Sequence, residues 1–257
     1  MNYEEDKPIS YCGIFGIYGS PTASAQAYYG LHALQHRGQE ASGIVTRSFN
    51  GDNRAHFNIV KGEGLVSEVF ADHNLLKNVL IGSSAIGHNR YSTTGAAKSR
   101  KNIQPFMVNY RMGNLAIGHN GNLTNAKELR KELVNEGAIF QTTSDTEVIL
   151  HLIARSKLDN QVDQIMEALK KIEGAYCVVI LTDDKLIAAR DPLGFRPLSL
   201  GKLSDAFLVG NNQVIVFLNQ RVLGEPYHIQ TKDRCRCKQP VYLSRTPSSS
   251  AFISSGT

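Results

Sequence analysis

Three features of the sequence predict a layered α+β fold. Strand-like runs come in blocks, helical segments fall between those blocks, and the chain has no internal repeat. A regular alternation of strands and helices would instead indicate a parallel α/β sheet. Of its 257 residues, 42% are hydrophobic and 20% are charged. The chain therefore has the size and composition of an ordinary globular protein that buries its own core.

Local patterns predict the elements in order. Residues 12–19 are apolar and punctuated by glycine, which indicates a buried strand ending in a turn. Further strands are expected at 43–47, 56–61, 84–88, 105–110 and 114–119. Helices are expected at 22–35, 124–136, 144–157 and 161–172. The apolar runs 175–182 and 185–190 predict a hairpin that turns at Asp183-Asp184.

Two of these helices carry start signals. Thr124 stands before an Ala-Lys-Glu run, and Ser144 with Glu147 fits the spacing of a capping box. Both signals place the helix start at the end of a polar segment.

Composition and charge exclude several classes of function. The formal net charge is +5, but Lys and Arg are scattered along the chain, which does not predict a nucleic-acid partner. No apolar run approaches the ~18 residues that cross a bilayer, and the acidic start MNYEEDKPISY is unlike a secretory signal. The four cysteines form no CxxC pair, which favours a reduced, cytoplasmic setting, and no His pattern indicates a metal site.

Cys12 is the first candidate functional residue. A free cysteine in an apolar segment is most often a small buried hydrophobe. Six stretches, including the one that holds Cys12, change that interpretation, and they are CGIFGIYG at 12–19, QHRGQEASGI at 35–44, GHNRYSTTG at 87–95, IGHNGNLTN at 117–125, TSDTEVILHLI at 143–153 and RDPLGFRPL at 190–198. In this order they resemble the class II glutamine amidotransferases, which are N-terminal-nucleophile hydrolases. The QHRGQE and NRYSTTG motifs are most similar to those of the amidophosphoribosyltransferase members.

The resemblance implies a four-layer αββα sandwich with Cys12 as the nucleophile. In this family the cysteine is the first residue of the mature chain and its own α-amine acts as the base. An α-amine with a pKa of about 7.7–8 and a thiol of about 8.5 can exchange a proton near neutral pH, whereas an amide nitrogen cannot accept one. The resemblance therefore implies that residues 1–11 are a propeptide.

The resemblance also implies roles for the other site residues. Asn120 and Gly121 match the oxyanion hole, although Asn-Gly is also a common turn. Arg90 matches the arginine that holds the substrate α-carboxylate, and a plain surface arginine is the alternative. Asp145 matches the carboxylate for the substrate ammonium, and a helix-start acid is the alternative. The remaining expected pocket residues are Arg37, Gly38, Tyr91, Ser92 and Thr93.

The resemblance covers residues 12–208. Residues 209–257 are interpreted as a diverged tail left by a frame shift or truncation, with the phosphoribosyltransferase domain absent. No cofactor is expected in this chain. Mg²⁺, an iron–sulfur cluster and a homo-oligomer are implied only for full-length family enzymes.

The implied function is hydrolysis of glutamine, the expected partner, to glutamate and ammonia. In the full-length enzyme the ammonia reacts with phosphoribosyl diphosphate to give phosphoribosylamine in purine synthesis. Two alternatives stay open at this point. One is another class II amidotransferase, such as those that feed glucosamine-6-phosphate or asparagine synthesis, and the other is a catalytically dead fragment.

Overall fold

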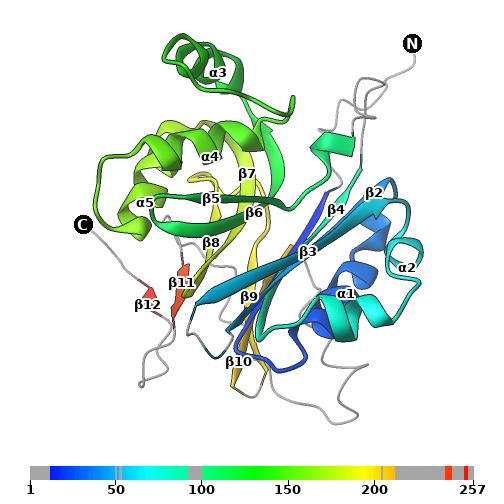
Figure 1. Ribbon diagram of the computed structural model, residues 1–257. Helices are drawn as coiled ribbons and strands as arrows, with labels where there is room; N and C mark the ends of the chain where they lie inside the picture. Colours follow the sequence, from blue (N-terminus) through cyan, green and yellow to red (C-terminus); the bar gives the residue numbers. More distant parts are fainter. Residues whose placement is uncertain are drawn as a thin grey trace, which may run out of the picture.

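The computed structural model describes residues 12–49, 51, 54–91, 100–203, 205–211, 241–244 and 252–253. Two antiparallel sheets lie face to face, and helices cover both outer faces (Figure 1). The predicted four-layer αββα sandwich is therefore confirmed.

The first sheet carries the N-terminal half of the site. Its strand order is β3-β2-β4-β1-β10-β9, and α1 (Ala23–Ala33) packs on its outer face (Figure 1). A short helix α2 (Val66–Val69) and a π-helical turn η2 (Leu75–Val79) extend this layer. The strands are β1 (Gly13–Tyr18), β2 (Ala41–Phe49), β3 (Ala55–Glu63), β4 (Ser84–Arg90), β9 (Ser199–Leu203) and β10 (Ala206–Gly210).

The second sheet has the order β12-β11-β8-β7-β6-β5. Helices α4 (Thr146–Arg155) and α5 (Gln161–Lys171) cover its outer face, and α3 (Ala126–Asn135) lies beside α4 (Figure 1). The strands are β5 (Phe106–Tyr110), β6 (Gly113–Leu123), β7 (Gly174–Thr182), β8 (Lys185–Arg190), β11 (Val241–Ser244) and β12 (Phe252–Ile253). Two 3-10 turns, η1 (Gln35–Arg37) and η4 (Arg100–Asn102), connect elements near the site.

Three apolar clusters hold the layers together. One lies between α1 and the first sheet, one between the second sheet and α4 with α5, and one between the two sheets. Strand β7 shows the division, because Val178 and Ile180 face the helices while Cys177 and Val179 face the other sheet. Side chains alternate along a strand, so a strand buried on both faces is a continuous apolar run. This accounts for the sequence AYCVVILT.

Both predicted helix starts lie before the observed ones. Helix α3 begins after Asn125, one residue beyond the expected Thr124. Helix α4 begins after Asp145, and the carboxylate of Glu147 accepts the backbone N–H groups of Gln141 at 2.7 Å and Thr142 at 2.8 Å. The predicted capping box is therefore wrong, because Glu147 fixes the preceding loop instead of the backbone of Ser144.

The expected domain boundary after residue 208 falls inside β10. Val209 and Gly210 pair with β1 in register, and the backbone N–H of Asn211 donates to the carbonyl of Ile14 at 3.2 Å. Residues up to 211 are therefore packed against the strand that follows Cys12. The other expected boundary, residues 1–11, lies outside the described residues, as do 212–240 of the tail.

Candidate active site

Cys12 stands immediately before β1, a central strand flanked by β4 and β10. Its thiol donates to the carbonyl of Tyr91 at 3.9 Å, and its own carbonyl accepts from Nε of Arg37 at 3.3 Å. Ile14, two residues on, faces the gap between the sheets. Strand alternation therefore directs the half-buried Cys12 side chain toward the second sheet as well.

Charged groups surround the Cys12 thiol. Burial raises the pKa of Cys12 above its ordinary value, and the negative charge of Asp145 adds to this. The hydrogen bond to Tyr91 and the positive charges of Arg90 and Arg196 act in the opposite direction. Because burial is the largest effect, the thiol stays protonated unless a nearby base takes its proton.

Asn120 and Gly121 lie within β6 rather than in a turn, so the turn interpretation is wrong. Asn120 is fully buried and pairs with Cys177, which faces the gap between the sheets. Directly opposed residues share one face of a sheet, so the Asn120 amide also faces the sheet of Cys12. A Cβ on Gly121 would meet the carbonyl oxygen of Ala175 at 2.3 Å, so only glycine fits there.

A buried histidine connects the strand beside Cys12 to the strand of Asn120. Nε2 of His88, on β4, lies 3.0 Å from the carbonyl of His119 on β6. A carbonyl only accepts, so Nε2 carries the proton. Burial lowers the pKa of His88 to about 3, which keeps the ring neutral. This bond connects β4, which pairs with β1, to the residue before Asn120, and so fixes the position of Asn120 relative to the end of β1.

Asp145 occupies the N-cap position of α4, but its side chain does not cap the helix. Oδ2 accepts the backbone N–H of Leu123 at 3.0 Å, and Oδ1 lies 3.5 Å from Nδ1 of His119. Burial alone would raise the pKa of Asp145, but the charge and hydrogen bond of His119 and the backbone N–H groups of Leu123 and Thr146 hold it below the ordinary value. The site thus contains an ionised carboxylate beside β6, the strand that holds Asn120.

The expected pocket residues gather around the ends of β1 and β4. Arg90 is half-buried at the end of β4, on the same face as His88, and Tyr91 next to it is exposed. Gly38 packs against this strand end so closely that a Cβ would meet the carbonyl carbon of Asn89 at 2.8 Å. The structure thus brings Arg37, Gly38, Arg90, Tyr91 and Asp145 into one region with Cys12. Ser92 and Thr93 lie outside the described residues.

Sequence reasoning missed three residues of this region. Arg196 acts electrostatically on Cys12, Asp191 holds the turn that carries Arg196, and Asn211 bonds to the first strand. The motif RDPLGFRPL contained two of them, but the spacing alone assigned no role to either. Cys177 is a second cysteine in the same interior, and burial, with the charge of Asp191, raises its pKa to about 12.

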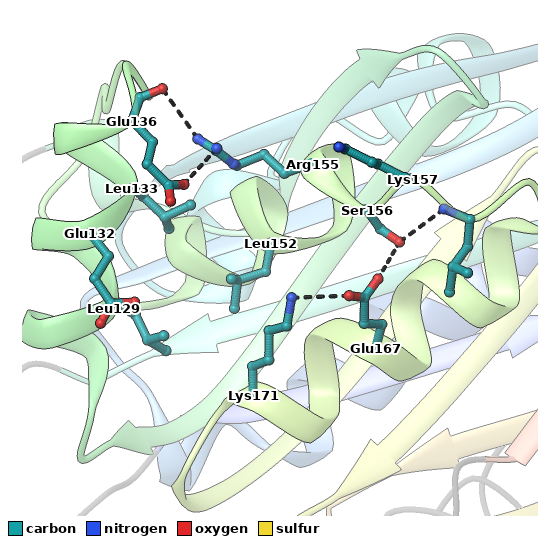
Figure 2. Close-up of a pocket in the computed structure, with 11 residues that line it drawn as sticks. Leu129, Glu132, Leu133, Glu136, Leu152, Arg155, Ser156, Lys157, Glu167 and Lys171 are labelled. Atoms are coloured by element: carbon teal, nitrogen blue, oxygen red, sulfur yellow. Dashed lines mark hydrogen bonds and ion pairs between the residues drawn. The ribbon is translucent and has the colours of Figure 1, made fainter.

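Two other hollows do not contain the predicted site residues. One, of about 450 Å³, lies among α3, α4 and α5, and four of its charged groups form two ion pairs (Figure 2). There Arg155 meets Glu136 at 2.5 Å and Lys171 meets Glu167 at 3.0 Å. The other, of about 760 Å³, lies between β5 and α4.

Within the described ranges, no group of three or more His, Cys, Asp or Glu side chains could ligate a metal ion. None of the described helices is long and apolar enough to cross a membrane.

Comparison with known proteins identifies the family. The glutamine amidotransferase domain matches residues 88–216. Amidophosphoribosyltransferase of Lacticaseibacillus casei is 47% identical over 190 residues, which are 74% of this chain and 94% of that relative. The chain belongs to the amidophosphoribosyltransferase family. The resemblance seen in the motifs is thereby confirmed.

Longer members of the amidophosphoribosyltransferase family share the same domain. The chloroplastic amidophosphoribosyltransferase 1 of Arabidopsis thaliana is 51% identical over 206 residues, which are 80% of this chain but 35% of the relative. The glutamine phosphoribosylpyrophosphate amidotransferase of B. subtilis, complexed with ADP and GMP, superimposes with a TM-score of 0.70 at 46% identity. That match covers 77% of this chain and 41% of the B. subtilis chain. The chain therefore spans well under half the length of these relatives.

Proposed function

We propose that the chain is a glutaminase that hydrolyses glutamine to glutamate and ammonia, with Cys12 as the nucleophile. The observation that carries this proposal is that two arginines and an ionised carboxylate from distant parts of the chain act on the Cys12 thiol, while the buried Asn120 lies on the facing side of the second sheet. Asn120, Arg37, Arg90 and Asp145 come from four separate elements. The family membership supports the same reaction.

The charges select the substrate. Arg90 presents a guanidinium that binds a carboxylate in bidentate fashion, and Asp145 presents a carboxylate that binds an ammonium. A free α-amino acid carries both groups on one carbon atom. Glutamine held in this way points its side-chain amide away from the α-carbon, toward the Cys12 thiol and the Asn120 amide.

The first chemical step is acylation of Cys12. The thiol gives its proton to the α-amine of Cys12, and the sulfur attacks the side-chain carbonyl carbon of glutamine. The resulting oxyanion accepts hydrogen bonds from the side-chain amide of Asn120 and the backbone N–H of Gly121. The α-ammonium returns the proton to the leaving nitrogen as the C–N bond breaks. Ammonia and a glutamyl thioester are formed.

The second step restores the enzyme. The α-amine takes a proton from water, and the hydroxide attacks the thioester carbon at the same oxyanion hole. The C–S bond breaks, the sulfur regains a proton, and glutamate leaves. Because an amide nitrogen cannot accept a proton, both steps require that residues 1–11 be removed so that Cys12 has a free amine.

The ammonia has a further use in the longer relatives. We propose that in the complete enzyme it reacts with phosphoribosyl diphosphate to give phosphoribosylamine, in agreement with the names of those relatives. Mg²⁺, an iron–sulfur cluster and homo-oligomer formation are assigned by this proposal to the complete enzyme. A cytoplasmic location is proposed from the four cysteines of the sequence, whose spacing forms no CxxC pair.

Ammonia release from glutamine by the purified chain tests this function. We expect activity from the chain that begins at Cys12, and activity lower by at least about 10³-fold from Cys12→Ala or from a chain that keeps residues 1–11. Asparagine and N-acetylglutamine serve as substrate controls, because they misplace the amide or remove the ammonium. Equal ammonia release from the chain that begins at Cys12 and from its Cys12→Ala variant would falsify the proposal.

A further inference from the structure

One carboxylate shapes the turn that follows β8. Asp191 is 1% exposed and accepts two backbone N–H groups, from Phe195 at 2.9 Å and from Arg196 at 3.0 Å. The backbone N–H of Gly194 donates to the carbonyl of Asp191 at 3.0 Å, and the φ of Gly194 is +70°, a conformation that favours glycine. The turn from Asp191 to Pro197 is therefore closed on itself and held in one shape.

Asn211 fastens this turn to the first strand. Its Oδ1 accepts the backbone N–H of Ile14 at 2.7 Å, and its Nδ2 donates to the carbonyl of Pro197 at 3.2 Å. Its own backbone N–H donates to the carbonyl of Ile14 at 3.2 Å. Asn211 is fully buried. A side-chain amide offers both an acceptor and a donor at one end, so one residue can satisfy both backbones.

The side-chain bond replaces a bond of the sheet. Ile14 lies one step beyond the Phe15–Gly210 pair, so its expected antiparallel partner is Asn211. In a regular hydrogen-bonded pair, the N–H of Ile14 would bond to the backbone carbonyl of Asn211. Here the side chain of Asn211 takes that role and extends its other end to the turn. The end of β10 is therefore adapted to join two segments.

The two joined segments carry the nucleophile and a cation. Cys12 is two residues before Ile14, and Arg196 is next to Pro197. The positive charge of Arg196 acts both on the Cys12 thiol and on the guanidinium of Arg37, which itself contacts the Cys12 carbonyl. A displacement of the turn would therefore change the electrostatic potential at the sulfur.

We propose that Asn211 is a positioning residue that holds the Asp191–Pro197 turn against the strand of Cys12 and so fixes the position of Arg196 relative to the sulfur. Asn211 touches neither substrate nor sulfur and acts through Arg196. The catalytic consequence rests on the glutaminase function proposed above, whereas the effect on the thiol does not.

The test compares two uncharged replacements, Asn211→Leu and Arg196→Gln, with the double variant. Asn78→Leu is the control, because Asn78 is exposed and far in the sequence from Arg196 and Asn211. Leucine at 211 keeps the size of the side chain and adds no charge. The rate at which iodoacetamide alkylates Cys12 is measured by peptide mass spectrometry from about pH 6 to about pH 9, because only the thiolate reacts. Ammonia release gives kcat and KM for glutamine in parallel, and melting temperatures report folding.

We expect the alkylation midpoint to move to higher pH in both single variants, with a rate at pH 7 about threefold or more below that of the unchanged chain. The double variant is expected to be no slower than Arg196→Gln, since both substitutions remove the same interaction. For Asn211→Leu, kcat should fall about tenfold while KM changes less than about twofold. Asn78→Leu should match the unchanged chain.

A folded Asn211→Leu chain with an unchanged alkylation profile would overturn the proposal, as would additive effects in the double variant. If Asn211→Leu does not fold, Arg196→Gln is the deciding variant. An unshifted alkylation profile in Arg196→Gln would show that Arg196 does not affect the Cys12 thiol and would overturn the proposal. Loss of ammonia release in every chain, with the alkylation shift intact, would instead contradict the glutaminase function and leave this inference standing.

Discussion

The two cysteines of the interior have different surroundings. Cys12 at the start of β1 and Cys177 within β7 both face the gap between the sheets, and Arg37 and Arg196 act on both. Burial is the main cause that raises the pKa of each. They differ in access and in neighbours. Cys177 is fully enclosed beside Asp191, whereas Cys12 is half-buried, and the charges of Arg90, Asp145 and Arg196 act on it.

The comparison teaches that positive charge alone does not produce a nucleophile. Arg37 and Arg196 act on both thiols, but a thiol in the middle of a strand has only amide nitrogens around it. A thiol at the start of a chain has an amine. If residues 1–11 are removed as proposed, position relative to the chain terminus, together with the facing Asn120, separates the two regions. Three experiments can sharpen or break this contrast.

The largest effect is expected for the facing amide. Asn120→Ala should lower kcat for ammonia release by about 10²–10³-fold, with a small change in KM, because the amide stabilises the oxyanion rather than bound glutamine. Steady-state kinetics on the chain beginning at Cys12 measures it. Asn114→Ala, another β6 asparagine outside the site, is the control. A loss confined to KM would show that Asn120 binds substrate in its ground state.

The second-largest effect is expected for His88, the buried histidine that connects β4, beside the strand of Cys12, to β6. His88 has a folded pKa of about 3, below the unfolded value of about 6.5. The unfolded chain therefore takes up a proton that the folded chain refuses, and stability falls as the pH drops from about 6.5 toward about 3. The slope reaches about 1.4 kcal/mol per pH unit. Urea unfolding at several pH values measures it.

His88→Gln supplies the comparison for that slope. A glutamine amide can still donate to the His119 carbonyl but does not titrate in this range. The variant should lose most of the acid sensitivity between about pH 6.5 and about pH 4. His73→Gln, an exposed histidine, should not. Parallel pH curves for His88→Gln and the unchanged chain would show that His88 is not the group responsible.

The smallest effect is expected at the second cysteine. Cys177→Ala removes a thiol that donates to the Pro197 carbonyl at 3.5 Å, so ammonia release should stay within about threefold of the unchanged chain. Iodoacetamide labelling of the unchanged chain should modify Cys12 and leave Cys177 intact under native conditions. Rapid labelling of Cys177 would contradict the contrast between the two regions.

Local patterns predicted most of the secondary structure. The hairpin of β7 and β8, the long strand β6 and helices α3 to α5 lie within a few residues of their expected positions. Periodicity and turn residues are properties of short segments, so they can be read before folding. Strands β9 and β10 escaped notice because each is short and β10 runs into a segment interpreted as tail.

The site was predicted only as a set of residues. Motif wording pointed to Cys12, Asn120 and Asp145, but the Asn-Gly pair could equally have been a turn and Asp145 a helix cap. The structure decided against the turn, because β7 pairs alongside Asn120. Asp145 does lie at the start of α4, and its carboxylate also accepts the backbone N–H of Leu123. Such contacts join residues far apart in the sequence, and local propensity does not encode them.

By itself the sequence determined the periodic elements and the family and pointed to Cys12 as the candidate nucleophile, because each of these depends on residues that are neighbours in the chain. Only the tertiary structure decided which groups meet at the sulfur. The pairing of β1 with β4 and β10 brings Arg90 to one side and the Asn211-held turn to the other. The physical reason is that register and sheet packing, set by burial over the whole chain, fix distances that no single segment contains.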